Sequence, residues 1–118
     1  METLKKTIRT LPKDYITRHL LIVNGLLPNQ LTRKEIQILA SFMGLHKELT
    51  KDSLFNTEAR KRVMKEFNMV PAGLSYHLTN IIKKGLIIKE DGLLKVHPSF
   101  FPEENGQNYI FKLEIKED

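Results

Sequence analysis

The chain contains no cysteine among its 118 residues, which excludes a disulfide framework and metal sites built on thiolates. It also has no long apolar run. The longest one is Leu20–Val23, whereas a membrane-spanning helix needs roughly 20 apolar residues. The first residues, METLKKTIRTLPKDY, have no apolar core of the kind found in secretory signals. We therefore expect a cytoplasmic protein that does not associate with membranes.

Signatures of catalysis are missing as well. The sequence has no phosphate-cradling glycine loop, no nucleophile elbow and no dinucleotide fingerprint. The adjacent acids Glu90-Asp91 and Glu103-Glu104 should diverge in turns and so cannot act as an acid–base pair. The histidines show no metal-ligand spacing on any one helix; they are His19, His46, His77 and His97. We expect no enzymatic activity, no cofactor and no metal site.

Positive charge is in excess and is unevenly distributed. Hydrophobic residues make up 41% and charged residues 28% of the chain, which suits one folded domain. The net charge is +5 and the isoelectric point is about 9.5. From Arg60 to Lys89 seven basic residues accompany a single acid, Glu66, whereas the residues after Pro98 carry five acids and two lysines. This concentration favours a polyanionic partner; the alternative is a solvated lysine-rich surface.

Three helices are predicted in the first half of the chain. Asp14 can cap a helix over Tyr15–Asn24 that stops at Gly25, although the pair Ile22-Val23 is also compatible with a strand. Thr32-Arg33-Lys34-Glu35 is a capping box that opens a second helix, running to residue 43. A third helix is expected to end at residue 67, and its N-cap is one of two neighbours, Asn56 or Thr57.

A fourth helix is predicted in the stretch VPAGLSYHLTNIIKKGLI, beginning at Pro71 and ended by Gly85. One stripe of this helix is apolar at helical spacing, with Leu74, Leu78, Ile81 and Ile82. The opposite face is small, hydrogen-bonding and basic, and its residues are Ala72, Tyr76, Thr79, Asn80 and Lys83. Such a face suits contact with the edges of bases.

Strands are predicted after this helix. The apolar runs Leu86–Lys89 and Leu93–Val96 should form a hairpin that turns at Asp91-Gly92. Residues 109–116, YIFKLEIK, alternate between apolar and polar, which predicts a third strand added to the hairpin sheet. The predicted core comprises Ile36, Leu39, Val63, Phe67, Leu74, Leu78, Ile81 and Leu86.

Residues 74–87 spell L-S-Y-H-L-x-x-I-x-x-x-G-L-I. This pattern resembles the recognition-helix-to-wing signature of bacterial and phage winged-helix regulators, and LTRKEIQILASFMGL resembles the first helix of such domains. The resemblance implies a mainly α fold with a small antiparallel β wing, a winged helix-turn-helix. On this interpretation residues 1–30 are an N-terminal extension with one helix, residues 31–97 are the core, and residues 98–118 are a loop and a C-terminal strand on the wing sheet.

The resemblance implies double-stranded DNA as partner, with base contacts from the fourth helix and backbone contacts from the third helix and the wing. The candidate DNA-binding residues are Lys61, Arg62, Lys65, Ser75, Tyr76, Thr79, Asn80, Lys83 and Lys84. Asn80 has the bidentate amide that pairs with adenine. The compact chain, rich in lysine and isoleucine, also resembles phage-encoded proteins, which would place it in the host cytoplasm or the virion.

The chain departs from the family pattern at three places. Tyr76 stands where an arginine is common, and Val70 stands where serine or threonine usually caps the recognition helix. Glu90 and Asp91 make the wing tip acidic, which would repel it from a DNA groove. Two hypotheses follow. The first is a small DNA-binding transcriptional regulator or replication accessory, dimeric if it acts at a palindrome. The second is a protein-interaction module in a phage particle or nucleoprotein complex.

Overall fold

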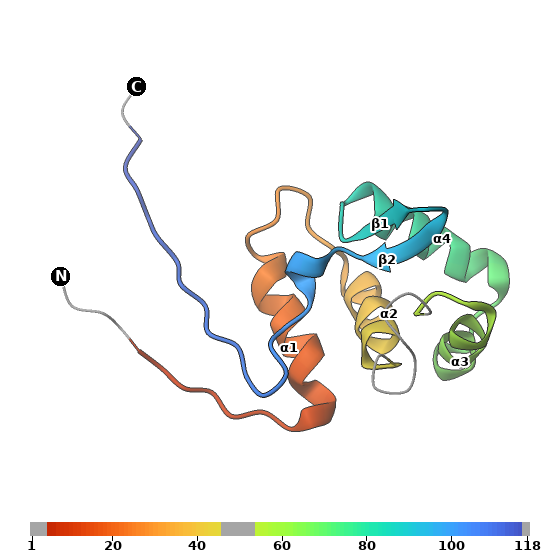
Figure 1. Ribbon diagram of the computed structural model, residues 1–118, viewed down its shortest axis with the longest axis horizontal. Helices are drawn as coiled ribbons and strands as arrows, with labels where there is room; N and C mark the ends of the chain where they lie inside the picture. Colours follow the sequence, from red (N-terminus) through yellow and green to blue (C-terminus); the bar gives the residue numbers. More distant parts are fainter. Residues whose placement is uncertain (1–4, 46–53, 117–118) are drawn as a thin grey trace.

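The computed structural model describes residues 5–45 and 54–116. Within these residues the chain forms four α-helices and one two-stranded antiparallel sheet (Figure 1). The elements are α1 (Pro12–Asn24), α2 (Arg33–Gly44), α3 (Thr57–Phe67), α4 (Pro71–Lys83), β1 (Ile87–Glu90), β2 (Leu93–Val96) and the short 3₁₀ helix η3 (Pro98–Phe100). The predicted order of helices followed by a hairpin is therefore confirmed. None of the helices in the described ranges is both long and apolar enough to cross a membrane.

The capping signals of α2 and α3 act as predicted. The Thr32 hydroxyl accepts a hydrogen bond from the Glu35 amide (3.2 Å), and the Glu35 carboxylate accepts one from the Thr32 amide (2.9 Å). At α3 the choice between two caps is decided, because the Asn56 side chain accepts from the Ala59 amide at 2.8 Å. Each bond satisfies an amide of the first turn that has no partner within its helix.

The prediction for α1 is wrong at its start. The segment is a helix and not a strand, but it begins at Pro12, and Asp14 lies inside its first turn. The N-cap is Leu11, whose side chain makes no capping bond. Proline fixes the backbone in a helical conformation and has no amide to satisfy. Pro12 can therefore start the helix one residue after an apolar neighbour, without an aspartate cap.

The core lies around α2, which packs against α1, α3 and α4. Of the predicted core residues only Phe67 is not fully buried; its ring lies at the edge, 4.7 Å from the Lys34 ammonium. Ile82 was expected on the buried stripe of α4 but is 37% exposed. With 3.6 residues per turn, Ile82 lies at the margin of a stripe centred on Leu74 and Leu78, so the buried surface is narrower than predicted.

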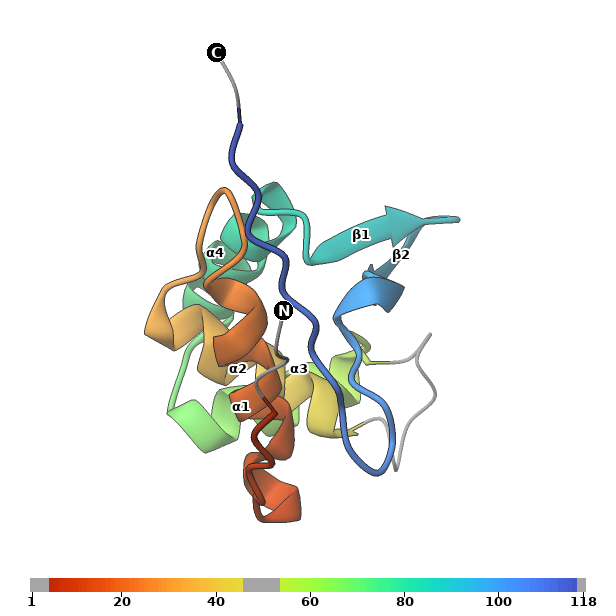
Figure 2. The same cartoon turned by 90° about the vertical axis from the view of Figure 1, so that its left-hand side faces the viewer.

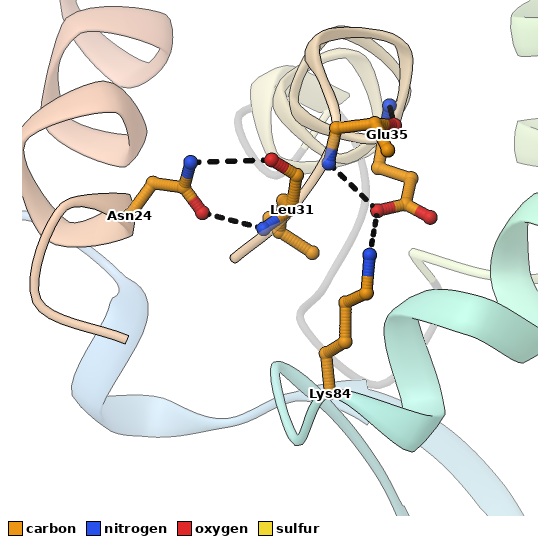
Figure 3. A network of polar contacts seen from close by, with 5 residues as sticks. Asn24, Leu31, Glu35 and Lys84 are labelled. Atoms are coloured by element: carbon orange, nitrogen blue, oxygen red, sulfur yellow. Dashed lines mark hydrogen bonds and ion pairs between the residues drawn. The ribbon is translucent and has the colours of Figure 1, made fainter. Parts of the chain in front are cut away.

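The end of α1 is bound to the chain that leads into α2. The Asn24 amide group accepts from the Leu31 amide at 2.6 Å and donates to the Leu31 carbonyl at 3.2 Å (Figure 3). One side chain thus makes both hydrogen bonds that a neighbouring strand would make to Leu31. Residues 25–30 form a loop closed at its base by this contact.

The hairpin follows α4 after Gly85, whose φ of +89° carries the chain out of the helix. Ile87 pairs with Val96 and Glu90 with Leu93. Both residues of the turn have positive φ, 52° at Asp91 and 79° at Gly92, as a two-residue type I′ turn requires. The predicted hairpin and its turn are confirmed.

The third strand predicted at residues 109–116 is absent, since the sheet of the described chain has only two strands. The segment instead runs as an extended trace along the α1 side of the molecule and away from it (Figures 1 and 2). An alternating pattern becomes a strand only where a neighbouring strand pairs with its backbone groups. The hairpin does not supply such a neighbour here, so the local pattern predicted a strand that the fold does not complete.

Candidate nucleic-acid interface

Helices α3 and α4 are joined by a short turn of three residues. Asn68 adopts the left-handed conformation (φ 52°, ψ 52°) at the end of α3, and the Met69 amide donates to the Met64 carbonyl at 2.8 Å. This is the helix-ending geometry that glycine or asparagine adopts at low cost. Val70 then leads directly into Pro71. The turn places α4 beside α3 (Figure 1).

Helix α4 divides into a buried and an exposed face. Leu74, Leu78 and Ile81 are buried against the core. Four of the five predicted base-contacting residues are exposed, namely Ser75, Tyr76, Thr79 and Lys83. The fifth, Asn80, is half-buried. Tyr76 is the largest exposed group, and its ring lies edge-on to the His77 ring, with centroids 5.5 Å apart. The exposed face therefore combines hydroxyl groups, an aromatic ring and one cation.

Helix α3 supplies three of the predicted cations. Lys61 and Lys65 are exposed. Arg62 is exposed too, but its guanidinium forms an ion pair with Glu58 one turn earlier, at 3.4 Å. Such a surface pair contributes at most about 1 kcal/mol and leaves the arginine accessible. Helix α3, which packs against α4, therefore carries exposed cations of its own.

Lys84 is not part of this exposed group. Its ammonium donates to the Glu35 carboxylate at 2.6 Å (Figure 3), and the Glu35 side chain is only 3% exposed. The same carboxylate oxygen accepts the Thr32 amide of the capping box. Lys84 therefore links the end of α4 to the start of α2. We assign it a structural role in place of the predicted phosphate contact.

The ionisation of Glu35 follows from this contact. Burial raises the pKa of the carboxyl group, but the hydrogen bonds from Lys84 and Thr32 and the charge of Lys84 outweigh it. The net result is a pKa below the ordinary value of 4.5, so the group is a carboxylate at neutral pH. The sequence signalled this glutamate only as half of a capping box. Its second partner lies 49 residues away, and no local pattern indicates such a contact.

The start of α4 carries no side-chain cap within the described chain. Val70 is the N-cap and makes no capping hydrogen bond, and Pro71 has no amide. The next amides, those of Ala72 and Gly73, thus face no capping side chain. Amides at the start of a helix carry partial positive charge and readily bind anions. Val70, which stands where a capping serine or threonine was expected, therefore leaves the helix start open to an external acceptor.

Comparison with models of protein families, with curated proteins and with solved structures finds no match to this chain. Within residues 5–45 and 54–116, no three histidine, aspartate or glutamate side chains gather as a metal site would require.

Proposed function

We propose that the protein is a winged helix-turn-helix that binds double-stranded DNA, as a transcriptional regulator or a replication accessory. In this proposal α3 and α4 are the helix-turn-helix pair, α4 is the recognition helix, and the β1–β2 hairpin is the wing. The observation that carries the proposal is the exposed face of α4. It combines hydrogen-bonding groups with an uncapped helix start, and the neighbouring helix α3 adds exposed cations.

Each group has a distinct role in the proposal. Lys61, Lys65 and Lys83 neutralise phosphates, which supplies affinity without sequence preference. The open amides at the start of α4 donate to a further phosphate oxygen. Tyr76 and Thr79 face the bases. Because Tyr76 stands where an arginine is usual, this position cannot make a bidentate contact to guanine; it contacts a phosphate or a thymine methyl group instead.

Asn80 is the candidate for reading adenine. The residue is half-buried, so in this proposal only the exposed part of its side chain reaches the groove. A bidentate contact to adenine contributes about 1–3 kcal/mol of discrimination. Recognition by this residue is therefore confined to a single base pair.

The hairpin contributes support and not groove insertion. Glu90 is paired with Lys95 across the hairpin at 3.7 Å, and Asp91 occupies the turn itself. These acidic groups at the tip are repelled by the phosphates that line a groove. The tip thus stays outside the DNA, and α4 carries the recognition.

One observation favours the second candidate function, a protein-interaction module in a phage particle or nucleoprotein complex. Large apolar side chains are exposed on the α1 side of the molecule, among them Leu11, Leu21 and Leu26, each more than half exposed. Large apolar side chains that are exposed are candidates for contact with another protein. Helix α1 lies apart from α3 and α4 (Figure 1), so a contact there can serve assembly alone or assembly together with DNA binding.

A mobility-shift assay with random-sequence duplex DNA across a salt series tests the DNA-binding proposal. We expect affinity to fall steeply as salt rises, because phosphate binding releases counterions. Lys61→Ala and Lys65→Ala should each weaken all sequences alike and reduce the salt slope by roughly one unit. Lys13→Ala, an exposed lysine on α1, is the matched control and should leave both unchanged. Affinity that neither falls with salt nor responds to the α3 variants would make the assembly function the leading one.

A further inference from the structure

Residues 109–116 carry the most exposed apolar side chains of the described chain. Ile110 is 95%, Leu113 is 100% and Ile115 is 96% exposed. The segment sits outside the proposed DNA-binding face and is not used by it. Exposed isoleucine and leucine at this density are costly in water, which indicates a surface that is covered in the functional state.

The segment already has the geometry of a β-strand. The rings of Tyr109 and Phe111 stack with an interplanar angle of 8° and centroids 6.4 Å apart. The Lys112 ammonium meets the Glu114 carboxylate at 2.5 Å. Both contacts join residues two positions apart, which lie on the same side only in an extended chain. One side therefore carries the odd-numbered, apolar residues, and the other carries Ile110 followed by alternating charges.

The start of the segment is anchored to the body of the protein. The His19 ring, buried in α1, lies with Nδ1 2.6 Å from the Tyr109 hydroxyl and Nε2 2.9 Å from the Phe100 carbonyl. The Tyr15 hydroxyl donates to the Glu103 carbonyl at 2.6 Å. The chain is thus fixed on α1 as far as Tyr109 and extends away from the body beyond it (Figure 1).

We propose that residues 109–116 pair with the same segment of a second copy, as an antiparallel two-stranded ribbon with its two-fold axis at Leu113. In this register Lys112 faces Glu114 of the second copy twice, once on each side of the axis. Phe111 faces Ile115 in the same way. Opposite charges and aromatic–β-branched pairs are both favourable across strands, and a symmetric dimer uses the same surface on both copies.

The charges select this register over its neighbours. Moving the axis to residue 112 places two Lys112 side chains opposite each other, and moving it to residue 114 does the same for Glu114. Like charges directly opposite destabilise a strand pair. An axis between two residues would set the apolar side of one strand against the charged side of the other. The sequence is therefore complementary to itself, which is the reason to assign a second copy as the partner.

The surroundings supply the cover that a ribbon needs. A two-stranded ribbon alone is marginally stable in water. The exposed apolar residues Leu11, Leu21 and Leu26 belong to α1 and the segments that flank it, and the 109–116 segment runs on the α1 side of the molecule (Figures 1 and 2). Pairing at the segment brings the two α1 surfaces toward each other and leaves α3 and α4 free.

Sedimentation velocity on the full chain with charge variants tests the proposal. The wild type should dimerise in a concentration-dependent manner. Lys112→Glu and Glu114→Lys should each weaken dimerisation by about tenfold or more, because each turns two attractive pairs into repulsive ones. A 1:1 mixture of the two variants should recover wild-type affinity, because the glutamates of one variant then face the lysines of the other at both pairs. Both positions are exposed, so the fold of the monomer is unaffected.

The control is Lys89→Glu, which changes the net charge as much as Lys112→Glu does but lies at an exposed position of β1, away from α1. It should leave the dimerisation constant within about twofold of the wild type. Four results overturn the proposal. The first three are a wild type that stays monomeric up to its solubility limit, single variants that dimerise like the wild type, and a mixture that dimerises no better than its components. The fourth is a loss of dimerisation in Lys89→Glu equal to that in Lys112→Glu, since net charge alone would then explain the effect.

Discussion

Helices α3 and α4 expose mainly cations and hydrogen-bonding groups, with Val70 as an apolar exception, whereas residues 109–116 carry the most exposed apolar side chains of the described chain. The two regions lie on opposite sides of the molecule (Figure 1). On the first side, polar groups are well hydrated and need no cover. On the second side, apolar groups lower the free energy only when another surface excludes water from them. The two sides therefore suit two kinds of partner, a polyanion and an apolar protein surface.

The largest expected effect contrasts a covered with an uncovered leucine. Leu78 is 3% and Leu113 is 100% exposed. Leu78→Ala should lower the free energy of unfolding by about 2–5 kcal/mol, through lost burial and a cavity. Leu113→Ala should change it by less than about 0.5 kcal/mol. Urea denaturation at a concentration where the chain is monomeric measures both, and equal losses would show that the two environments are not as described.

The next effect separates two adjacent lysines at the end of α4. Lys84→Ala leaves the buried Glu35 carboxylate without its cation and should lower the free energy of unfolding by about 1–3 kcal/mol. Lys83→Ala removes an exposed cation and should leave stability within about 0.5 kcal/mol of the wild type. In DNA binding the two variants should differ in the opposite way, because only Lys83→Ala should reduce the slope of affinity against salt concentration. Urea denaturation and mobility shifts on the same two proteins give both readings, and matching behaviour of the pair would refute the assignment.

The smallest effect is a gradual loss of stability in acid. Burial lowers the pKa of His19 below its ordinary value of 6.5, an effect that the hydrogen bond to Phe100 only partly offsets. The unfolded chain then binds this proton at a higher pH than the folded chain, so stability falls as pH drops below about 6.5. Glu35, whose folded pKa is also lowered, adds a second loss below about 4.5 by the same reasoning.

Urea titrations between pH 8 and pH 2 measure these losses. His19→Gln retains a donor and an acceptor but does not titrate, and it should remove the first loss while keeping the second. Glu35→Gln should do the opposite. A stability that stays level from pH 7 to pH 5 in the wild type would show that His19 does not couple protonation to folding.

Features set by neighbours in sequence were predictable, and features set by distant partners were not. The Thr32 capping box, the Asp91-Gly92 turn and the apolar stripe of α4 each depend on residues a few positions apart, and each is found in the structure. The prediction of a strand at residues 109–116 was wrong, because a strand forms only when a second strand pairs with it. No local sequence pattern indicated the contacts of His19 with Phe100 and Tyr109, which lie 81 and 90 positions away.

The candidate site shows the same division. Helical periodicity was enough to place Tyr76, Thr79 and Lys83 on an exposed face, although Asn80 is half-buried. It carried no information on Lys84, because the partner of that lysine is a glutamate on another helix. Exposure can thus be predicted from a repeating pattern, whereas the pairing of a charge depends on how the helices come together.

The two hydrogen bonds between the Asn24 side chain and the Leu31 backbone have a consequence for engineering. Because the two hydrogen bonds close the loop at its base, the course of α1 and α2 does not depend on the length of the chain between residues 25 and 30. Doubling the length of a flexible loop costs only about 0.6 kcal/mol in closure entropy. A peptide tag or a small folded domain inserted after Pro28, which is exposed, should therefore be accommodated with both helices in place.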